Sequence, residues 1–76
     1  VSGNMATITW TAKNNSSFLN GQREANTVRG AVTAARHYLE NELMGEGKIT
    51  IFENGQPIRQ DEKSMFTSYK WETKKL

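Results

Sequence analysis

The sequence predicts an α+β fold, in which a single helix packs on a small, mainly antiparallel sheet of three to four strands. Apolar residues recur at helical spacing in residues 27–44, and apolar and polar residues alternate in the flanking segments. An Asn-Gly pair divides one of these segments into a hairpin. The expected order is a strand, an optional short second strand, the helix, the hairpin and a final strand.

The helix is the strongest signal in the chain. Apolar side chains follow one another at intervals of three or four residues, as on one face of a helix with 3.6 residues per turn. They are Val28, Val32, Ala35, Leu39 and Leu43. Thr27 is the expected N-cap, because its hydroxyl can accept a hydrogen bond from the first turn. Gly45 and Gly47 are expected to end the helix, since glycine adopts the left-handed conformation needed there.

The segment before the helix contains one clear strand. Ala6–Ala12 alternates apolar residues with threonine, which favours a half-buried strand. Lys13–Asn26 is polar and mostly typical of a loop. Asn20-Gly21 resembles a hairpin turn, although its flanks alternate poorly. Gln22–Ala25 is a candidate for a short second strand.

A β-hairpin is predicted after the helix. Asn54-Gly55 suits a two-residue type I′ turn, because both residues tolerate the positive φ that this turn requires. A two-residue turn places Phe52 opposite Pro57 and Ile51 opposite Ile58. Ile51 and Ile58 are then expected on the helix side, with Phe52 on the opposite face.

The C-terminal segment is interpreted as a charged turn followed by a last strand. Gln60–Lys63 has the composition of a turn, and Ser64–Thr73 alternates with the period of a strand. This alternation predicts that Met65, Tyr69 and Trp71 face the core. We also expect one cluster that combines both tryptophans with the helix, namely Trp10, Trp71, Leu39 and Val32.

Length and composition indicate one small domain. Leu, Ile, Val and Phe supply only 14 of the 76 residues, so the core is expected to be small. Residues 1–4 are interpreted as a non-native remnant or a disordered N-terminus, and residues 5–76 as the domain. The chain has no cysteine and a net charge of +2, and no segment is apolar and long enough to span a bilayer. We expect a cytoplasmic protein without membrane contact.

No catalytic or metal site is predicted. His37 is the only histidine, and without cysteine it does not complete a usual transition-metal set. Glu53, Asp61 and Glu62 are interpreted as solvated carboxylates at turns. The chain also lacks a phosphate-binding glycine motif. We therefore expect a protein that is not an enzyme and uses no cofactor.

The leading hypothesis is a non-catalytic module that acts through protein–protein contacts, such as an accessory protein of bacteria or phage. The helix face opposite the apolar stripe carries small or uncharged side chains, whereas a solvated face usually carries Lys and Glu. The candidate contact residues are Gly30, Thr33, Ala34, His37 and Asn41. Either a different protein or a second copy of the chain would dock there.

The alternative hypothesis is weak binding of single-stranded nucleic acid. If the helix covers one face of the sheet, Phe52, Phe66 and Lys70 share the other face. Aromatic rings beside a cation on an open sheet can stack with bases. Against this, the acidic residues nearly balance the basic ones, and the aromatic residues follow no ribonucleoprotein motif.

Overall fold

A computed structural model of the chain describes residues 7–14, 20–42 and 45–76. Five strands, one helix and one 3-10 turn are present in these ranges. In chain order they are β1 (Ile8–Lys13), β2 (Asn20–Ala25), α1 (Val28–Glu42), β3 (Gly47–Glu53), β4 (Gln56–Lys63), η2 (Met65–Thr67) and β5 (Glu72–Lys75). The predicted α+β class is confirmed, but the sheet has five strands rather than three or four.

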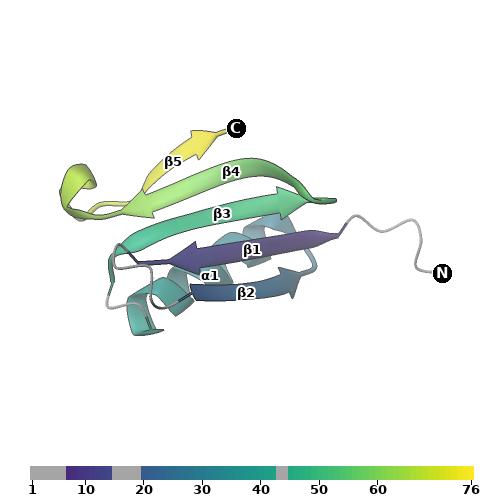
Figure 1. The fold of residues 1–76 in the computed structure, drawn as a ribbon, viewed down its shortest axis with the longest axis horizontal. Helices are drawn as coiled ribbons and strands as arrows, with labels where there is room; N and C mark the ends of the chain where they lie inside the picture. Colours follow the sequence, from purple (N-terminus) through teal and green to yellow (C-terminus); the bar gives the residue numbers. More distant parts are fainter. Residues whose placement is uncertain (1–6, 15–19, 43–44) are drawn as a thin grey trace.

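The five strands form one antiparallel sheet in the order β2-β1-β3-β4-β5. The helix packs on a single face of this sheet, mainly against β1, β2 and β3. In Figure 1 the helix lies behind these strands, while β4 and β5 extend beyond it. The other face of the sheet is not covered by the helix.

The core lies between the helix and the three strands that it covers, as the helical period predicts. Its buried members are Ile8, Trp10, Ala12, Ala31, Val32, Ala35, Leu39, Ile49 and Ile51. Trp71 is half-buried and packs against this cluster. The expected grouping of both tryptophans with Leu39 and Val32 is therefore confirmed. Leu43 lies outside the described residues.

The helix begins as predicted. The Thr27 hydroxyl accepts a hydrogen bond from the backbone N–H of Gly30 at 3.0 Å, which satisfies one of the free donors of the first turn. At the other end, Gly45 has a φ of 78° and donates its N–H to the carbonyl of Leu39. The structure does not describe residues 1–6, so the interpretation of residues 1–4 as a non-native remnant or a disordered N-terminus lies outside the described residues.

Gly47 has a different role from the predicted one. It is the first residue of β3, opposite Lys63, and does not end the helix. A Cβ atom at this position would overlap the backbone carbonyl oxygen of Lys13. Glycine is therefore required here by the close approach of two chain segments.

Gly47→Ala is expected to destabilise the fold by about 1–3 kcal/mol, because the backbone around Lys13 must shift to admit a methyl group. Urea unfolding measures this change. Gly55→Ala is the control, since Gly55 has a φ of 83° but open space around its Cβ position. Gly47 also has a positive φ, 151°. If both variants lose the same stability, positive φ rather than overlap explains the need for Gly47.

The β3–β4 hairpin has the predicted turn but an unpredicted bulge. Asn54 and Gly55 both have positive φ, and Phe52 pairs with Pro57 as expected. The expected pairing of Ile51 with Ile58 is wrong, because the register shifts there and Ile51 pairs with Arg59. Ile58 still packs against the core. The extra residue moves the side chains beyond it to the other face of the sheet.

The C-terminal assignment was wrong in two places. Residues 60–63 form the second half of β4 instead of a turn, and only Glu72–Lys75 within the last segment is a strand. Residues 65–67 form η2, so Met65 and Tyr69 are exposed rather than directed into the core.

Upstream, Asn20 and Gly21 lie inside β2 rather than in a turn, and pair with Lys13 and Ala12.

Candidate functional site

The helix face proposed for protein contacts is exposed to solvent. All five of its predicted residues, Gly30, Thr33, Ala34, His37 and Asn41, lie on the outer surface of α1. The side-chain amide nitrogen of Asn41 lies 2.8 Å from Nδ1 of His37. A shallow depression runs along this face from Thr27 to His37. The use of this face in binding remains a prediction.

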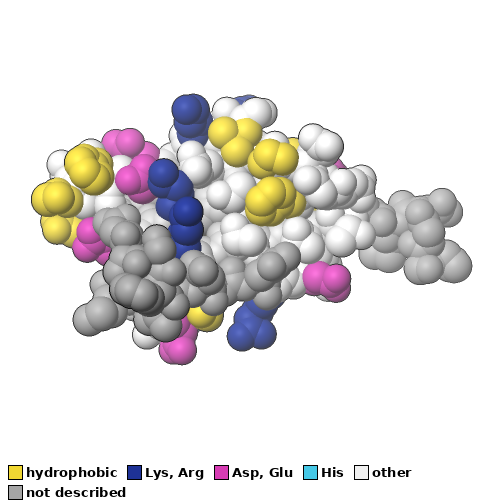
Figure 2. All heavy atoms as spheres, in the orientation of Figure 1, with side chains coloured by type: hydrophobic (Ala, Val, Ile, Leu, Met, Phe, Trp, Pro, Cys, Tyr) yellow, Lys and Arg dark blue, Asp and Glu magenta, His cyan; other side chains and the backbone are white. Residues whose placement is uncertain are grey.

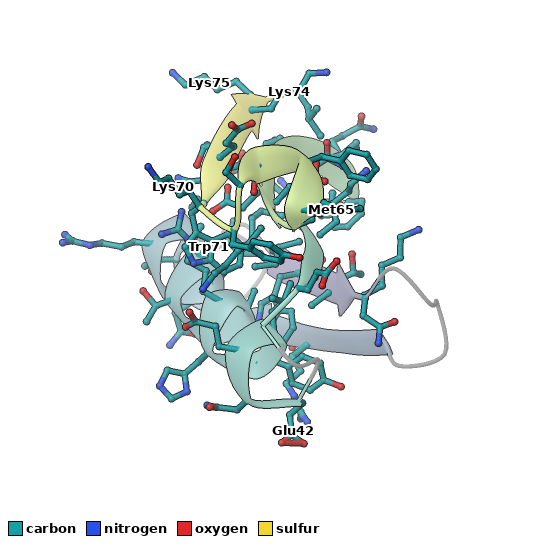
Figure 3. The ribbon with its side chains drawn as sticks, turned by 90° about the vertical axis from the view of Figure 1, so that its left-hand side faces the viewer. Glu42, Met65, Lys70, Trp71, Lys74 and Lys75 are labelled. Atoms are coloured by element: carbon teal, nitrogen blue, oxygen red, sulfur yellow. The ribbon has the colours of Figure 1, made fainter. Side chains whose placement is uncertain are left out.

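The predicted nucleic-acid residues are not brought together on one sheet face. Phe52 lies within β3 on the open face, beside Thr9 of β1. Phe66 lies on η2, where its side chain is 82% exposed. Lys70 follows this turn and points to the helix side of the sheet in Figure 3. The expected strand through Ser64–Thr73 would have aligned them, but that strand does not form.

Sequence reasoning missed the most strongly organised polar cluster in the structure, which surrounds Asp61. The Asp61 side chain is fully buried and accepts hydrogen bonds from two arginines. Nη2 and Nε of Arg36 lie 2.7 and 3.0 Å from Oδ2, and Nε of Arg59 lies 2.9 Å from Oδ1. The cluster joins α1 to β4, the strand that lies next to the helix-covered part of the sheet.

The charge of Asp61 is stabilised by its partners. Burial by itself raises the pKa of this carboxyl, but the hydrogen bonds and positive charges of Arg59 and Arg36 outweigh burial and hold the pKa below its ordinary value. Both carboxylate oxygens are occupied by arginine donors. Asp61 is therefore suited to fixing these two arginines and not to proton transfer.

Trp71 and Lys63 extend the cluster. The guanidinium carbon of Arg36 lies 4.7 Å from the Trp71 ring centroid, and Nζ of Lys63 lies 5.8 Å from it. These distances allow cation–π attraction. Lys63 also forms an ion pair with Glu40 of the helix at 2.9 Å. Four side chains from β4, the helix and the segment before β5 are thus held in one arrangement.

The β3–β4 bulge explains why the sequence did not reveal this cluster. In the predicted register Gln60 would face the core and Asp61 the solvent. The additional residue reverses this order, so Asp61 pairs with Ile49 on the helix side. The only signal in the sequence is the spacing of Arg59 and Asp61, which places both on one side of a strand.

A second feature is an exposed apolar turn between β4 and β5. Met65, Phe66 and Tyr69 are 63%, 82% and 57% exposed, and we call these three residues the apolar knob. Figure 2 shows hydrophobic groups gathered at the left end of the molecule, where Figure 1 draws η2. Large exposed apolar groups that lie close together are typical of interaction sites.

The turn that carries the apolar knob is tightly hydrogen-bonded. Ser64 is buried, and its hydroxyl accepts from the N–H of Phe66 and donates to Glu62. The Thr67 hydroxyl in turn accepts from the N–H of Ser64, which completes a capping box. The carbonyl of Ser64 also accepts from the N–H of Tyr69 at 2.8 Å. The knob is thus presented by a rigid support.

Two consecutive residues of this turn have a left-handed backbone. Ser68 and Tyr69 have φ values of 56° and 60°. This conformation is unfavourable for residues other than glycine, asparagine and aspartate, and such strain concentrates at functional sites. The Tyr69 side chain is 57% exposed in this conformation.

No metal site or membrane span is evident in the described parts of the chain. Within residues 7–14, 20–42 and 45–76, no three His, Asp or Glu side chains come together as a set of metal ligands. The helix found in these ranges is too short and too polar to cross a membrane. The Ser64 hydroxyl donates a hydrogen bond to Glu62 and accepts one from the N–H of Phe66.

Comparison of the chain with protein-family models, curated proteins and solved structures gave no match. The two organised features of the described residues are the Asp61 cluster and the apolar knob.

Proposed function

We propose that the protein is a non-catalytic interaction module that binds another protein through the apolar knob. The observation that carries this proposal is the exposure of Met65, Phe66 and Tyr69 on a turn that is itself fixed by buried hydrogen bonds. Methionine and aromatic residues are enriched at the centre of protein interfaces. The sequence-based hypothesis of protein binding is kept, but its site moves from the helix to this turn.

Rigidity supports binding by the knob. A flexible loop would lose conformational entropy when a partner fixes it, whereas a rigid turn has little left to lose. The hydrogen bonds from Thr67 and Tyr69 to Ser64 already hold the backbone of the turn. Each of the three side chains then acts as an anchor that fits a pocket on the partner.

A different protein is favoured over a second copy of this chain. Outside the knob, Leu76 is the only large hydrophobic side chain that is strongly exposed among the described residues. Outside its own knob, the described part of a second copy therefore offers few exposed large apolar side chains for the knob to contact. Contact between two knobs would involve three residues a side, far fewer than the roughly 20–30 of a stable interface.

Phe66→Ser is expected to abolish recovery of the partner without weakening the fold, because its side chain contributes mainly to the surface. A photo-crosslinking residue at position 69 of the tagged chain, with either Phe or Ser at position 66, is irradiated in cell lysate and captures the partner. The dissociation constant of the purified partner then measures the effect. We expect Phe66→Ser to raise it about 30-fold or more, as replacement of an interface anchor does.

Two variants serve as matched controls. Leu76→Ser removes an exposed hydrophobic residue outside the knob, and Ala34→Glu places a charge on the outer helix face. Both should bind the purified partner like the wild type. If Ala34→Glu loses binding and Phe66→Ser keeps it, the helix face is the site, and the proposal is contradicted. A rise in solution mass that depends on Phe66 would show self-association, which also contradicts the proposal.

A further inference from the structure

Positive charge collects where the sheet extends beyond the helix. The helix covers β1, β2 and β3. The helix side of β4 and β5 is therefore left open, and α1 borders it as a step. Six of the ten Lys and Arg residues of the chain belong to this step or its border, and we call them the basic ledge. They are Arg29, Arg36, Arg59, Lys63, Lys70 and Lys75.

The fold places these residues from four separate segments. On α1, Arg29 and Arg36 are seven residues apart, which puts them on one flank about 10.5 Å from each other. On β4, Arg59 and Lys63 lie on the helix side, about 13 Å apart. Lys75 lies opposite Arg59 in the neighbouring strand. Figure 3 shows Lys70 and Lys75 on the helix side, whereas Lys74 points to the other side.

The ledge is not neutralised by its acidic residues. Asp61 is shared by Arg36 and Arg59, and Glu40 pairs with Lys63. Arg29, Lys70 and Lys75 are exposed, and none of them forms an ion pair with an acidic residue among the described residues. Like charges directly across two strands, as in Arg59 and Lys75, are unfavourable by themselves. Six cations and two acidic partners leave the basic ledge with an excess positive charge of about four.

From this arrangement we infer that the basic ledge binds the phosphate backbone of single-stranded nucleic acid. Planar guanidinium groups suit phosphate as a ligand. Asp61 holds the guanidinium groups of Arg36 and Arg59 by one edge, and both arginine side chains stay about a third exposed. The inferred site differs from the predicted set of Phe52, Phe66 and Lys70, because it depends on backbone charge and not on base stacking.

An acidic protein is a poorer fit to the same surface. A protein interface needs an apolar centre, but on the ledge Val32 is buried and Trp71 already contacts Arg36 and Lys63. Interfaces with nucleic acids are more polar and much more positively charged. The surface formed by β4 and β5 is about 10 Å wide. This width favours single-stranded nucleic acid over a duplex.

The test uses fluorescence anisotropy of a labelled deoxythymidine oligonucleotide of about 20 nucleotides with the full chain. About four phosphate contacts predict a slope near −2.8 for log affinity against log salt. Between about 50 and 200 mM NaCl the affinity should then fall about 50-fold. Loss of two contacts, in Arg29→Gln/Lys75→Gln, should lower the affinity more than tenfold at about 50 mM and flatten this slope.

Lys13→Gln/Lys48→Gln is the matched control, because it removes the same charge from cross-strand neighbours on the open face. It should change the affinity less than about threefold, since it leaves the phosphate contacts in place. Thermal melting should show both double variants to be folded, because these side chains are at the surface. Equal weakening by both, or no binding at about 20 mM salt, would overturn the inference.

Two further ligands test the alternatives to single-stranded nucleic acid, namely an acidic protein and a duplex. Polyglutamate that binds as tightly and with the same dependence on Arg29 and Lys75 would show that an acidic protein is the partner. Tighter binding of a duplex of equal length would contradict the assignment to a single strand. Phe66→Ser should leave oligonucleotide binding unchanged, so the ledge and the apolar knob are tested independently.

Discussion

Asp61→Ala should cause one of the largest losses of stability available to a single substitution in this chain. It removes the one carboxylate shared by Arg36 and Arg59 and leaves both guanidinium groups beside each other without an anion. Breaking a fully buried pair in this way costs about 3–5 kcal/mol. Because both arginines are about a third exposed, we expect the lower end, near 3 kcal/mol.

Urea unfolding at neutral pH measures this loss. Glu24→Ala is the matched control, since it removes an exposed carboxylate from β2 and should change stability by less than about 0.5 kcal/mol. If Asp61→Ala unfolds at the same urea concentration as Glu24→Ala, the cluster does not hold β4 to the helix.

The same carboxyl makes stability depend on acidity. Its pKa is lower in the folded state than in the unfolded state, so its contribution is complete above the unfolded value of about 3.9 and disappears as pH falls through the folded value. Wild-type stability should therefore decline below about pH 4. Asp61→Asn should flatten this decline, and an unchanged pH profile would show that other carboxyls cause it.

Leu39→Ala is the second substitution with a large expected effect. The Leu39 side chain is completely buried and belongs to the cluster with Trp10 and Ile51. Truncation at a site of this kind removes apolar contacts and leaves a cavity, at a cost of about 2–5 kcal/mol. A domain of this size has a total stability of about 4–11 kcal/mol, so the variant should be strongly destabilised.

Leu76→Ala provides the comparison, because Leu76 is 56% exposed at the end of the chain. The same chemical change should cost less than about 0.5 kcal/mol there. Thermal melting of the two variants gives the contrast directly. A melting temperature for Leu39→Ala close to that of Leu76→Ala would show that Leu39 is not a core residue.

The helix and its core face followed directly from the sequence. A period of 3.6 residues fixes which side of a helix is apolar, and the hydrophobic effect then buries that side. Ala35 and Leu39 are buried for this reason. The Asn54-Gly55 turn was equally local, since it depends only on which residues tolerate positive φ.

The outer helix face and the last strand show the limits of local patterns. Small, uncharged residues indicated that Ala34 and His37 lie outside the core, but such residues say little about what binds them. Alternation through Ser64–Thr73 suggested a strand, yet hydrogen bonds from Ser64 and Thr67 bend this segment into η2. The apolar knob exists only because that turn replaces the strand.

The sequence by itself determined the α+β class, the helix, its buried stripe and the hairpin turn, because each depends on neighbours within a few residues. Only the tertiary structure decided the Asp61 cluster and the basic ledge. A one-residue bulge moved Asp61 inward to meet Arg36, 25 positions away along the chain. The charges of the basic ledge likewise meet because strand order and helix position bring α1 beside β4 and β5 at one edge of the sheet.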